Sequence, residues 1–263
     1  MTDRTDNIDI EGIDPDEELV ADYDVRSPAS RTLLTVVGTI LAVAVVGGLV
    51  LGVSLLKRGT TTSTTDIALD DPAQIVIDAG SADVRLVQGS PGVVRVRADV
   101  TSGLRKTDFQ VGRRGDVIKL VAGCQEWLNP GCGVEATLEL PKGFPVVVRT
   151  TAGDVAVRDI SAGVLKVQSA DGDFTGSGLK LDELDVTTTS GDISAAFAKQ
   201  PYGVKMTSRS GDVSATMIDG KRTYAVTTES RSGDVSSGLE SDDKGEGFVR
   251  ARTGSGDISL AMG

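Results

Sequence analysis

A four-residue phrase ending in Gly-Asp occurs six times between Val146 and Gly263. Consecutive copies are 19, 19, 20, 22 and 23 residues apart, and each is followed by Val, Ile or Phe. Alternating apolar and polar residues precede them, which is the pattern of a β-strand. A period of about 20 residues built from short strands is typical of a solenoid, in which one unit stacks on the next. The repeated pairs are Gly153-Asp154, Gly172-Asp173, Gly191-Asp192, Gly211-Asp212, Gly233-Asp234 and Gly256-Asp257.

We interpret these pairs as structural turn residues. Glycine takes the positive φ that other residues resist, and the aspartate carboxylate accepts hydrogen bonds from backbone N–H groups one or two positions on. If the copies are in register, the aspartates form a column of like charges about 4.8 Å apart, with about 1 kcal/mol of repulsion per neighbour in water. The sequence supplies nearby partners for these charges in Arg149, Arg209, Arg231 and Arg252.

The composition argues against several classes of function. The chain has no histidine, which removes the commonest general base and the commonest nitrogen ligand of metals. We find no motif of a known catalytic centre, so we predict no catalytic residues, no metal site and no cofactor. Two alternatives stay open: Ca²⁺ on the aspartate column, and a carbohydrate-active β-helix enzyme. The net charge of −11 argues against a nucleic-acid partner.

The first 56 residues indicate a membrane protein. Residues 1–31 are acidic and polar, and we expect a disordered cytoplasmic tail. Residues 32–56 are uncharged, and about 20 apolar residues suffice for a helix to cross a bilayer, so we predict one transmembrane α-helix. Gly48 and Gly52 form a G-x-x-x-G step that could bring two such helices together in a homo-oligomer.

The two cysteines decide the expected orientation, because basic residues flank both ends of the apolar segment equally. Cys124 and Cys132 are the only cysteines, and they lie in a short segment rich in turn-forming residues. We predict a disulfide between them, and disulfides persist outside the cytoplasm. The C-terminal domain is therefore expected outside the cell membrane and the N-terminus in the cytoplasm.

The remaining boundaries follow from composition. Residues 57–66 are rich in threonine and are expected to be a linker, and residues 67–263 an extracytoplasmic all-β domain, a single-stranded β-helix or β-solenoid with coils of about 20 residues. Within it, residues 67–145 form a less regular cap that contains the cysteine loop, and residues 146–263 the regular repeats. Ser81-Ala82-Asp83-Val84 looks like a degenerate copy of the phrase. The cap strands are expected near residues 74–78, 83–87, 93–98, 108–111, 117–121 and 134–140.

The repeated [ST]-x-G-D-[VI] phrase, following an apolar segment and a small cysteine loop, resembles the putative adhesin family of bacterial β-strand-repeat proteins, a domain of unknown function. The resemblance covers residues 67–263 and implies a β-helix displayed at the cell surface, with no catalytic residues to carry over. We therefore predict a single-pass envelope protein whose solenoid is an adhesion, binding or spacer surface for an unknown envelope ligand. An alternative is envelope-stress sensing through a cytoplasmic partner of the tail.

Overall fold

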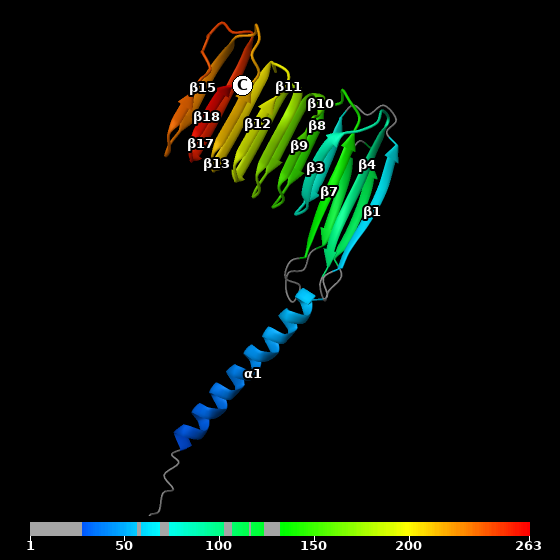
Figure 1. The fold of residues 1–263 in the computed structure, drawn as a ribbon, viewed down its shortest axis with the longest axis vertical. Helices are drawn as coiled ribbons and strands as arrows, with labels where there is room; N and C mark the ends of the chain where they lie inside the picture. Colours follow the sequence, from blue (N-terminus) through cyan, green and yellow to red (C-terminus); the bar gives the residue numbers. More distant parts are fainter. Residues whose placement is uncertain (1–27, 57–58, 69–73, 103–106, 116, 124–131) are drawn as a thin grey trace, which may run out of the picture. The chain divides into compact units, whose positions relative to one another are not determined.

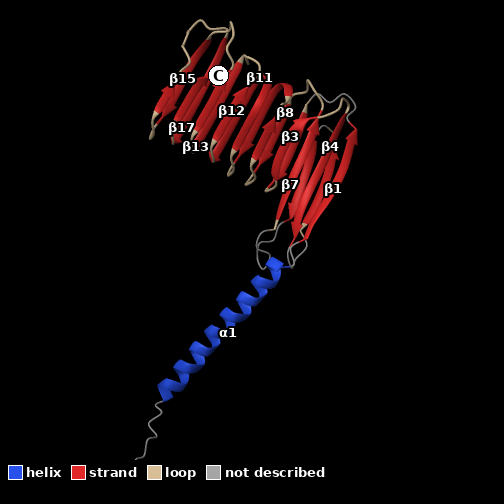
Figure 2. Ribbon diagram, in the orientation of Figure 1, coloured by secondary structure: helices blue, strands red, loops and turns tan. Residues whose placement is uncertain are grey.

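The computed structural model describes residues 28–56, 59–68, 74–102, 107–115, 117–123 and 132–263. Most of the predicted tail, residues 1–27, lies outside the described residues, as does Cys124. The described residues form one helix and 18 strands (Figures 1 and 2).

The helix, α1, runs from Pro28 to Leu56 and contains the whole of the apolar segment. Within the described residues, no helix satisfies the combination of length and apolar character that a membrane span requires. The transmembrane role of residues 32–56 therefore stays a prediction.

The strands occupy nearly all of the chain after α1, which we call the β-domain (Gly59–Gly263). They are β1 (Gly59–Ala68), β2 (Ile75–Gly80), β3 (Asp83–Gln88), β4 (Val93–Ser102), β5 (Asp108–Arg114), β6 (Val117–Gly123), β7 (Gly133–Leu140), β8 (Val146–Thr150), β9 (Val155–Arg158), β10 (Ser161–Ser169), β11 (Phe174–Ser190), β12 (Ile193–Phe197), β13 (Gly203–Ser210), β14 (Val213–Met217), β15 (Tyr224–Ser230), β16 (Val235–Ser237), β17 (Gly247–Ser255) and β18 (Ile258–Met262).

These strands form two faces. Face A has the order β1-β4-β7-β3-β9-β11-β12-β14-β18-β16. Face B has the order β5-β6-β2-β8-β10-β11-β13-β17-β15. The 17-residue strand β11 belongs to both faces, so all 18 strands are connected in one hydrogen-bonded sheet. The predicted all-β, solenoid-like fold is confirmed at this level.

Parallel pairing between successive repeats gives the coils their register. Leu165 lies opposite Val146 on one side and Leu184 on the other, at steps of 19 residues, and Leu184 lies opposite Val204. Such in-register pairing places the same position of each repeat on the same side of the stack, because side chains alternate between the two surfaces of a strand.

The last two coils are not stacked in chain order, contrary to the expectation that successive repeats lie on each other. Strand β13 pairs with β17, and β17 in turn pairs with β15. On the other face β14 pairs with β18, which pairs with β16. The C-terminal coil (β17 and β18) is therefore inserted between its two predecessors, as the red strands of Figure 1 show.

The cap contains both parallel and antiparallel strands. β2 and β3 continue the parallel stack beneath β8 and β9, whereas β1, β4 and β5 run antiparallel to their neighbours. The six strands expected between residues 74 and 140 coincide with β2–β7. The linker expected at residues 57–66 is corrected for its described part, because residues 59–66 lie in β1. Threonine is a good strand former, and β1 pairs with β4 along its full length.

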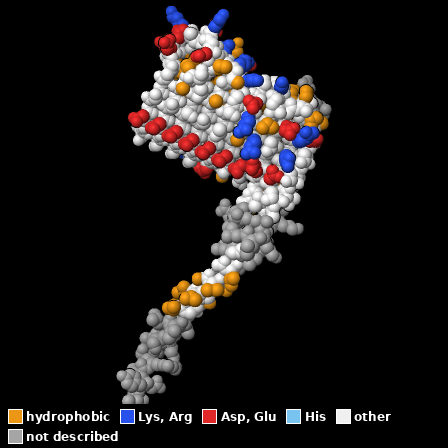
Figure 3. Space-filling model, in the orientation of Figure 1, with side chains coloured by type: hydrophobic (Ala, Val, Ile, Leu, Met, Phe, Trp, Pro, Cys, Tyr) orange, Lys and Arg blue, Asp and Glu red, His pale blue; other side chains and the backbone are white. Residues whose placement is uncertain are grey.

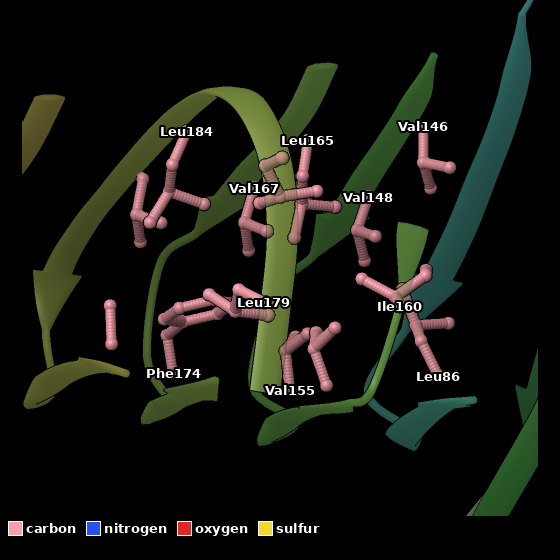
Figure 4. Packing of buried hydrophobic residues seen from close by; sticks show 14 of the residues in the cluster. Leu86, Val146, Val148, Val155, Ile160, Leu165, Val167, Phe174, Leu179 and Leu184 are labelled. Atoms are coloured by element: carbon pink, nitrogen blue, oxygen red, sulfur yellow. The ribbon is translucent and has the colours of Figure 1, made fainter. Parts of the chain in front are cut away.

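The core lies between the two faces. Val146, Leu165 and Leu184 project inward from face B, and Val155 and Phe174 from face A, each at most 2% exposed. Figure 4 shows these side chains packed in successive layers. Burial of one such side chain contributes about 1.5–3 kcal/mol, so a coil gains most of its stability from contact with the coils on either side.

Candidate functional site: the aspartate ladder

The Gly-Asp pairs meet at one edge of the β-domain, where each coil turns from face B to face A. The φ values of Gly172, Gly191, Gly211, Gly233 and Gly256 are between +136° and +143°, a region that favours glycine. A Cβ added at Gly191 would lie 2.2 Å from the carbonyl oxygen of Gly172, and the other repeat glycines have equally close contacts. Glycine is thus required for its backbone angle and for the close approach of adjacent turns.

Along the stack, the carboxylate of every repeat aspartate except the last, Asp234, accepts a hydrogen bond from the backbone N–H of the aspartate in the next coil. Asp173 N–H donates to Asp154 Oδ1, and Asp192 N–H donates to Asp173 Oδ1, both at 2.8 Å. The series continues at 2.8 Å through Asp212, Asp257 and Asp234. We call this series the aspartate ladder. It corrects the expectation that each carboxylate binds N–H groups within its own turn.

The ladder begins in the cap. Asp154 N–H donates to Asp83 Oδ1 at 3.0 Å, so the degenerate copy at residues 81–84 supplies the first aspartate. A second backbone bond runs in the opposite direction at each step. Val84 N–H donates to Asp154 C=O, and Val155 N–H donates to Asp173 C=O, both at 2.8 Å. Two bonds per step fix the turns relative to each other.

A column of buried or half-buried hydroxyl groups, which the sequence analysis missed, supports the turns from inside. Ser208 Oγ donates to Gly191 C=O at 3.1 Å, and Thr253 Oγ1 donates to Gly211 C=O at 2.9 Å. Thr150 and Ser230 bond in the same way to Gly80 and Gly256. The sequence did contain a signal, because a threonine or serine stands four residues before each repeat aspartate. These hydroxyls donate to the carbonyl groups of the turn glycines, and so give these backbone acceptors a hydrogen-bond partner.

The expected pairing of arginines with the ladder is not what the structure shows. The ion pairs among the described residues leave the ladder aspartates unpaired with arginine, and Arg252 instead pairs with Glu229 at 3.3 Å. The ladder carboxylates lie on the surface, where solvent weakens their repulsion, and Figure 3 shows a row of acidic side chains along one edge of the domain. In the part of the chain that the structure describes, no three Asp, Glu, Cys or His side chains are grouped to hold a metal ion.

Cys132 is disulfide-bonded. Its predicted partner, Cys124, is the other cysteine of the chain and lies outside the described residues.

Comparison with known proteins gives one family and several distant structures. Residues 142–261 match the family model described as Toastrack DUF4097. No curated protein matches the chain. A crystal structure of a putative cell adhesion protein from Clostridium sporogenes is 12% identical, with a TM-score of 0.46, over 78% of this chain and 100% of that one. A putative adhesin from Bacteroides fragilis is 14% identical, with a TM-score of 0.36, over 76% of this chain and 97% of that one.

Proposed function

Residues 142–261 belong to the Toastrack DUF4097 family, and from the geometry of this domain we propose that the chain displays its solenoid at the cell envelope as a non-catalytic adhesion or binding surface. The observation that carries the proposal is the continuous aspartate ladder from Asp83 to Asp234. It locks successive turns together, so that outward side chains stand at a fixed spacing of about 4.8 Å on both faces. Extended solenoid surfaces of this kind serve as binding platforms.

The outward side chains form regular rows suited to contact. On face A the row contains Ser194, Ser214 and Ser259, which are opposite one another in register. On face B, Lys166 and Lys205 flank Asp185, each with its Nζ 3.6 Å from a carboxylate oxygen. Short polar side chains on one face and alternating charges on the other give the two faces different binding chemistry.

The shifted pKa values of Asp66, Arg95 and Tyr224 have structural causes. The hydrogen bond from Arg95 lowers the pKa of Asp66, and that same bond raises the pKa of Arg95. Burial raises the pKa of Tyr224, whose hydroxyl donates to Pro201 C=O at 3.0 Å.

Adherence of cells that express the full chain tests this function. We would introduce Ser194→Glu, Ser214→Glu and Ser259→Glu on face A, and separately Lys166→Glu and Lys205→Glu on face B. Both variant sets change exposed or half-exposed positions, and circular dichroism checks that the fold is kept. We expect the variants of one face to lose adherence to an envelope-coated surface and the other set to keep it. Equal adherence of both sets and of cells that lack the chain would contradict the proposal.

We further propose that α1 anchors the chain in the cell membrane, with the N-terminus in the cytoplasm and the β-domain outside. The support is the uncharged segment 32–56 and the disulfide-bonded Cys132. In α1 the described large apolar side chains are more than half exposed, at Val36, Val37, Ile40, Leu41, Val43, Val45, Val46 and Leu49. In whole cells an impermeant thiol reagent should label the cysteines only after reduction. Absence of labelling in reduced intact cells, with labelling after lysis, would place the β-domain inside.

A further inference from the structure

The inserted C-terminal coil creates a second feature, on face B, that the turn repeats do not explain. Where the coil turns, Arg209 of one coil, Gly254 of the inserted coil and Arg231 of the outermost coil lie side by side. The register fixes this, because Ser208 lies opposite Thr253, and Thr253 opposite Ser230. Two arginines therefore flank a glycine, with roughly 10 Å between their coils, which is two strand spacings.

Gly254 and these two arginines line a surface hollow of about 310 Å³. A Cβ on this residue would lie 2.6 Å from the carbonyl oxygen of Arg209, so the backbone contact excludes a side chain there. The next row along the strands contains Thr207, Arg252 and Glu229, in register with one another, and all three also line the hollow. We call this hollow the arginine notch.

The notch has an excess of positive charge on a chain whose net charge is −11. Arg209 and Arg231 are exposed, and no ion pair within the described residues involves either of them. Arg252 pairs with Glu229 at 3.3 Å, but both side chains are more than half exposed, and such surface pairs contribute little and exchange readily. Among the residues that line the notch, three guanidinium groups and one carboxylate give an excess of two positive charges.

We propose that the arginine notch binds a phosphate group, either free inorganic phosphate or a phosphate monoester on a larger ligand. A guanidinium group presents N–H donors in a planar fork that matches phosphate oxygens, and two forks on opposite walls can hold one phosphate between them. Near neutral pH a phosphate monoester has a charge of about −1.5 to −2, which matches the charge of the notch. A carboxylate has a single charge and engages one fork. The proposal names a ligand group for the binding surface proposed above and rests on that function.

The order of the coils is essential to this site. If the coils were stacked in chain order, Arg209 would lie beside Arg231, and Gly254 would lie outside both. The two arginine side chains would then be adjacent, with no glycine gap between them. The notch thus depends on the inserted coil, and neither the Gly-Asp phrase nor the sequence spacing predicts it.

Titration of the full chain with inorganic phosphate, followed by the ³¹P resonance at low ionic strength, tests the proposal. We expect saturable binding, and glycerol phosphate as a second probe shows whether a monoester binds as well as the free ion. Binding of both supports a ligand-borne phosphate, and binding of inorganic phosphate alone supports the free ion. The double variant Arg209→Gln/Arg231→Gln should bind at least tenfold more weakly. Arg209→Lys/Arg231→Lys keeps the charge without the fork and should be intermediate.

Arg149→Gln is the matched control, because Arg149 occupies in its own coil the position that Arg252 occupies in the inserted coil. It should bind phosphate as the wild type does. Three results would overturn the proposal: no saturable binding by the wild type, binding by the double Gln variant within twofold of it, or equally strong binding of acetate. The adherence assay separates the two proposals, because cells that adhere although the chain binds no phosphate would refute the notch alone.

Discussion

Each Gly-Asp pair acts between coils rather than within one turn. The glycine lets two turns approach, and the aspartate carboxylate then accepts the N–H of its neighbour. These hydrogen bonds set the position of each turn relative to the next one. The free energy that favours stacking comes from the apolar side chains in the core. The Gly-Asp pairs are therefore the most strictly repeated residues of the sequence, because few residue types fit the backbone geometry of these turns.

Asp192→Ala removes the acceptor of the Asp212 N–H, a bond of 2.8 Å, and should lower the free energy of unfolding by about 1 kcal/mol. Asp192→Asn keeps an oxygen acceptor and removes a charge from a column of like charges, so its stability should equal or exceed that of the wild type. Thermal unfolding measures both, with Asp219→Ala in an exposed return as the control. Equal destabilisation by Ala and Asn would show that the charge itself is needed.

Gly191→Ala should lower stability by about 2–4 kcal/mol, because it combines a strained φ of +143° with a Cβ 2.2 Å from Gly172 C=O. Gly163→Ala is the matched control, since no atom beyond its chain neighbours lies within 4 Å of the place its Cβ would take, and its φ is ordinary. Denaturant unfolding of both variants gives the difference. A loss below 1 kcal/mol for Gly191→Ala would mean that the turns are free to separate.

Sequence reasoning identified the repeat glycines and aspartates but not the direction of their bonds. A carboxylate next to a turn can accept from the N–H groups of its own turn or of the next turn. Which of these bonds forms depends on the distance between coils, which the sequence does not give. The hydroxyls at Thr150, Ser208 and Thr253 were missed for a related reason. Threonine and serine are common in strands, so their fixed place four residues before each aspartate has meaning only when the stack is known.

At the scale of strands, the two ends of the stack differ. The cap end has antiparallel strands, where β1 pairs with β4 along its full length and the exposed Arg95–Asp66 ion pair, at 2.8 Å, joins the two strands. The other end is formed by β15 and the three-residue strand β16, all of whose residues are exposed. A short edge strand offers few unpaired backbone groups to another chain, which limits edge-to-edge aggregation.

The attachment of β1 should depend on pH. Because the hydrogen bond from Arg95 lowers the pKa of Asp66 below its usual value of 3.8, the carboxylate binds protons less readily in the folded chain. Its stabilising effect is present above that value and is lost as pH falls through the lowered pKa. Hydrogen exchange of the β1 amides, corrected for the intrinsic rate, should therefore show protection that declines below about pH 3.8. In Asp66→Asn this pH-dependent part of the protection should be absent while the backbone pairing with β4 remains, and a wild-type profile in that variant would contradict this role.

At the scale of the whole β-domain, the coil order is the feature that the sequence could not predict. The family resemblance and the stacked architecture are confirmed, whereas the membrane span and the cell location stay predictions. All three C-terminal copies carry the same Ser-Gly-Asp and a hydroxyl at the same place, so any of them fits next to any other. Because each copy offers the same hydrogen-bonding groups to its neighbour, the residues of the turn do not determine which coil stacks next.

Engineered disulfides would establish the order directly. Ser214 lies opposite Ser259, and Ser259 opposite Ser236, so Ser214→Cys/Ser259→Cys and Ser236→Cys/Ser259→Cys should each form a bond. Ser214→Cys/Ser236→Cys should not, because two strand spacings, roughly 10 Å, exceed the Cα separation that a disulfide allows. Mass spectrometry of the cross-linked peptides distinguishes these bonds from the native cysteines. If a bond formed only between positions 214 and 236, the coils would be stacked in chain order, and the insertion of the C-terminal coil would be wrong.

The inserted coil also has a consequence for biosynthesis. The ribosome makes β15 and β16 before β17 and β18, yet the later pair lies beneath the earlier one. The place of β15 and β16 in the stack is therefore fixed only after β17 and β18 have been made. Because the copies fit next to one another, a chain that stopped before β17 would leave β13 and β14 open to β15 and β16, and an early stop would change the order of the stack as well as its length.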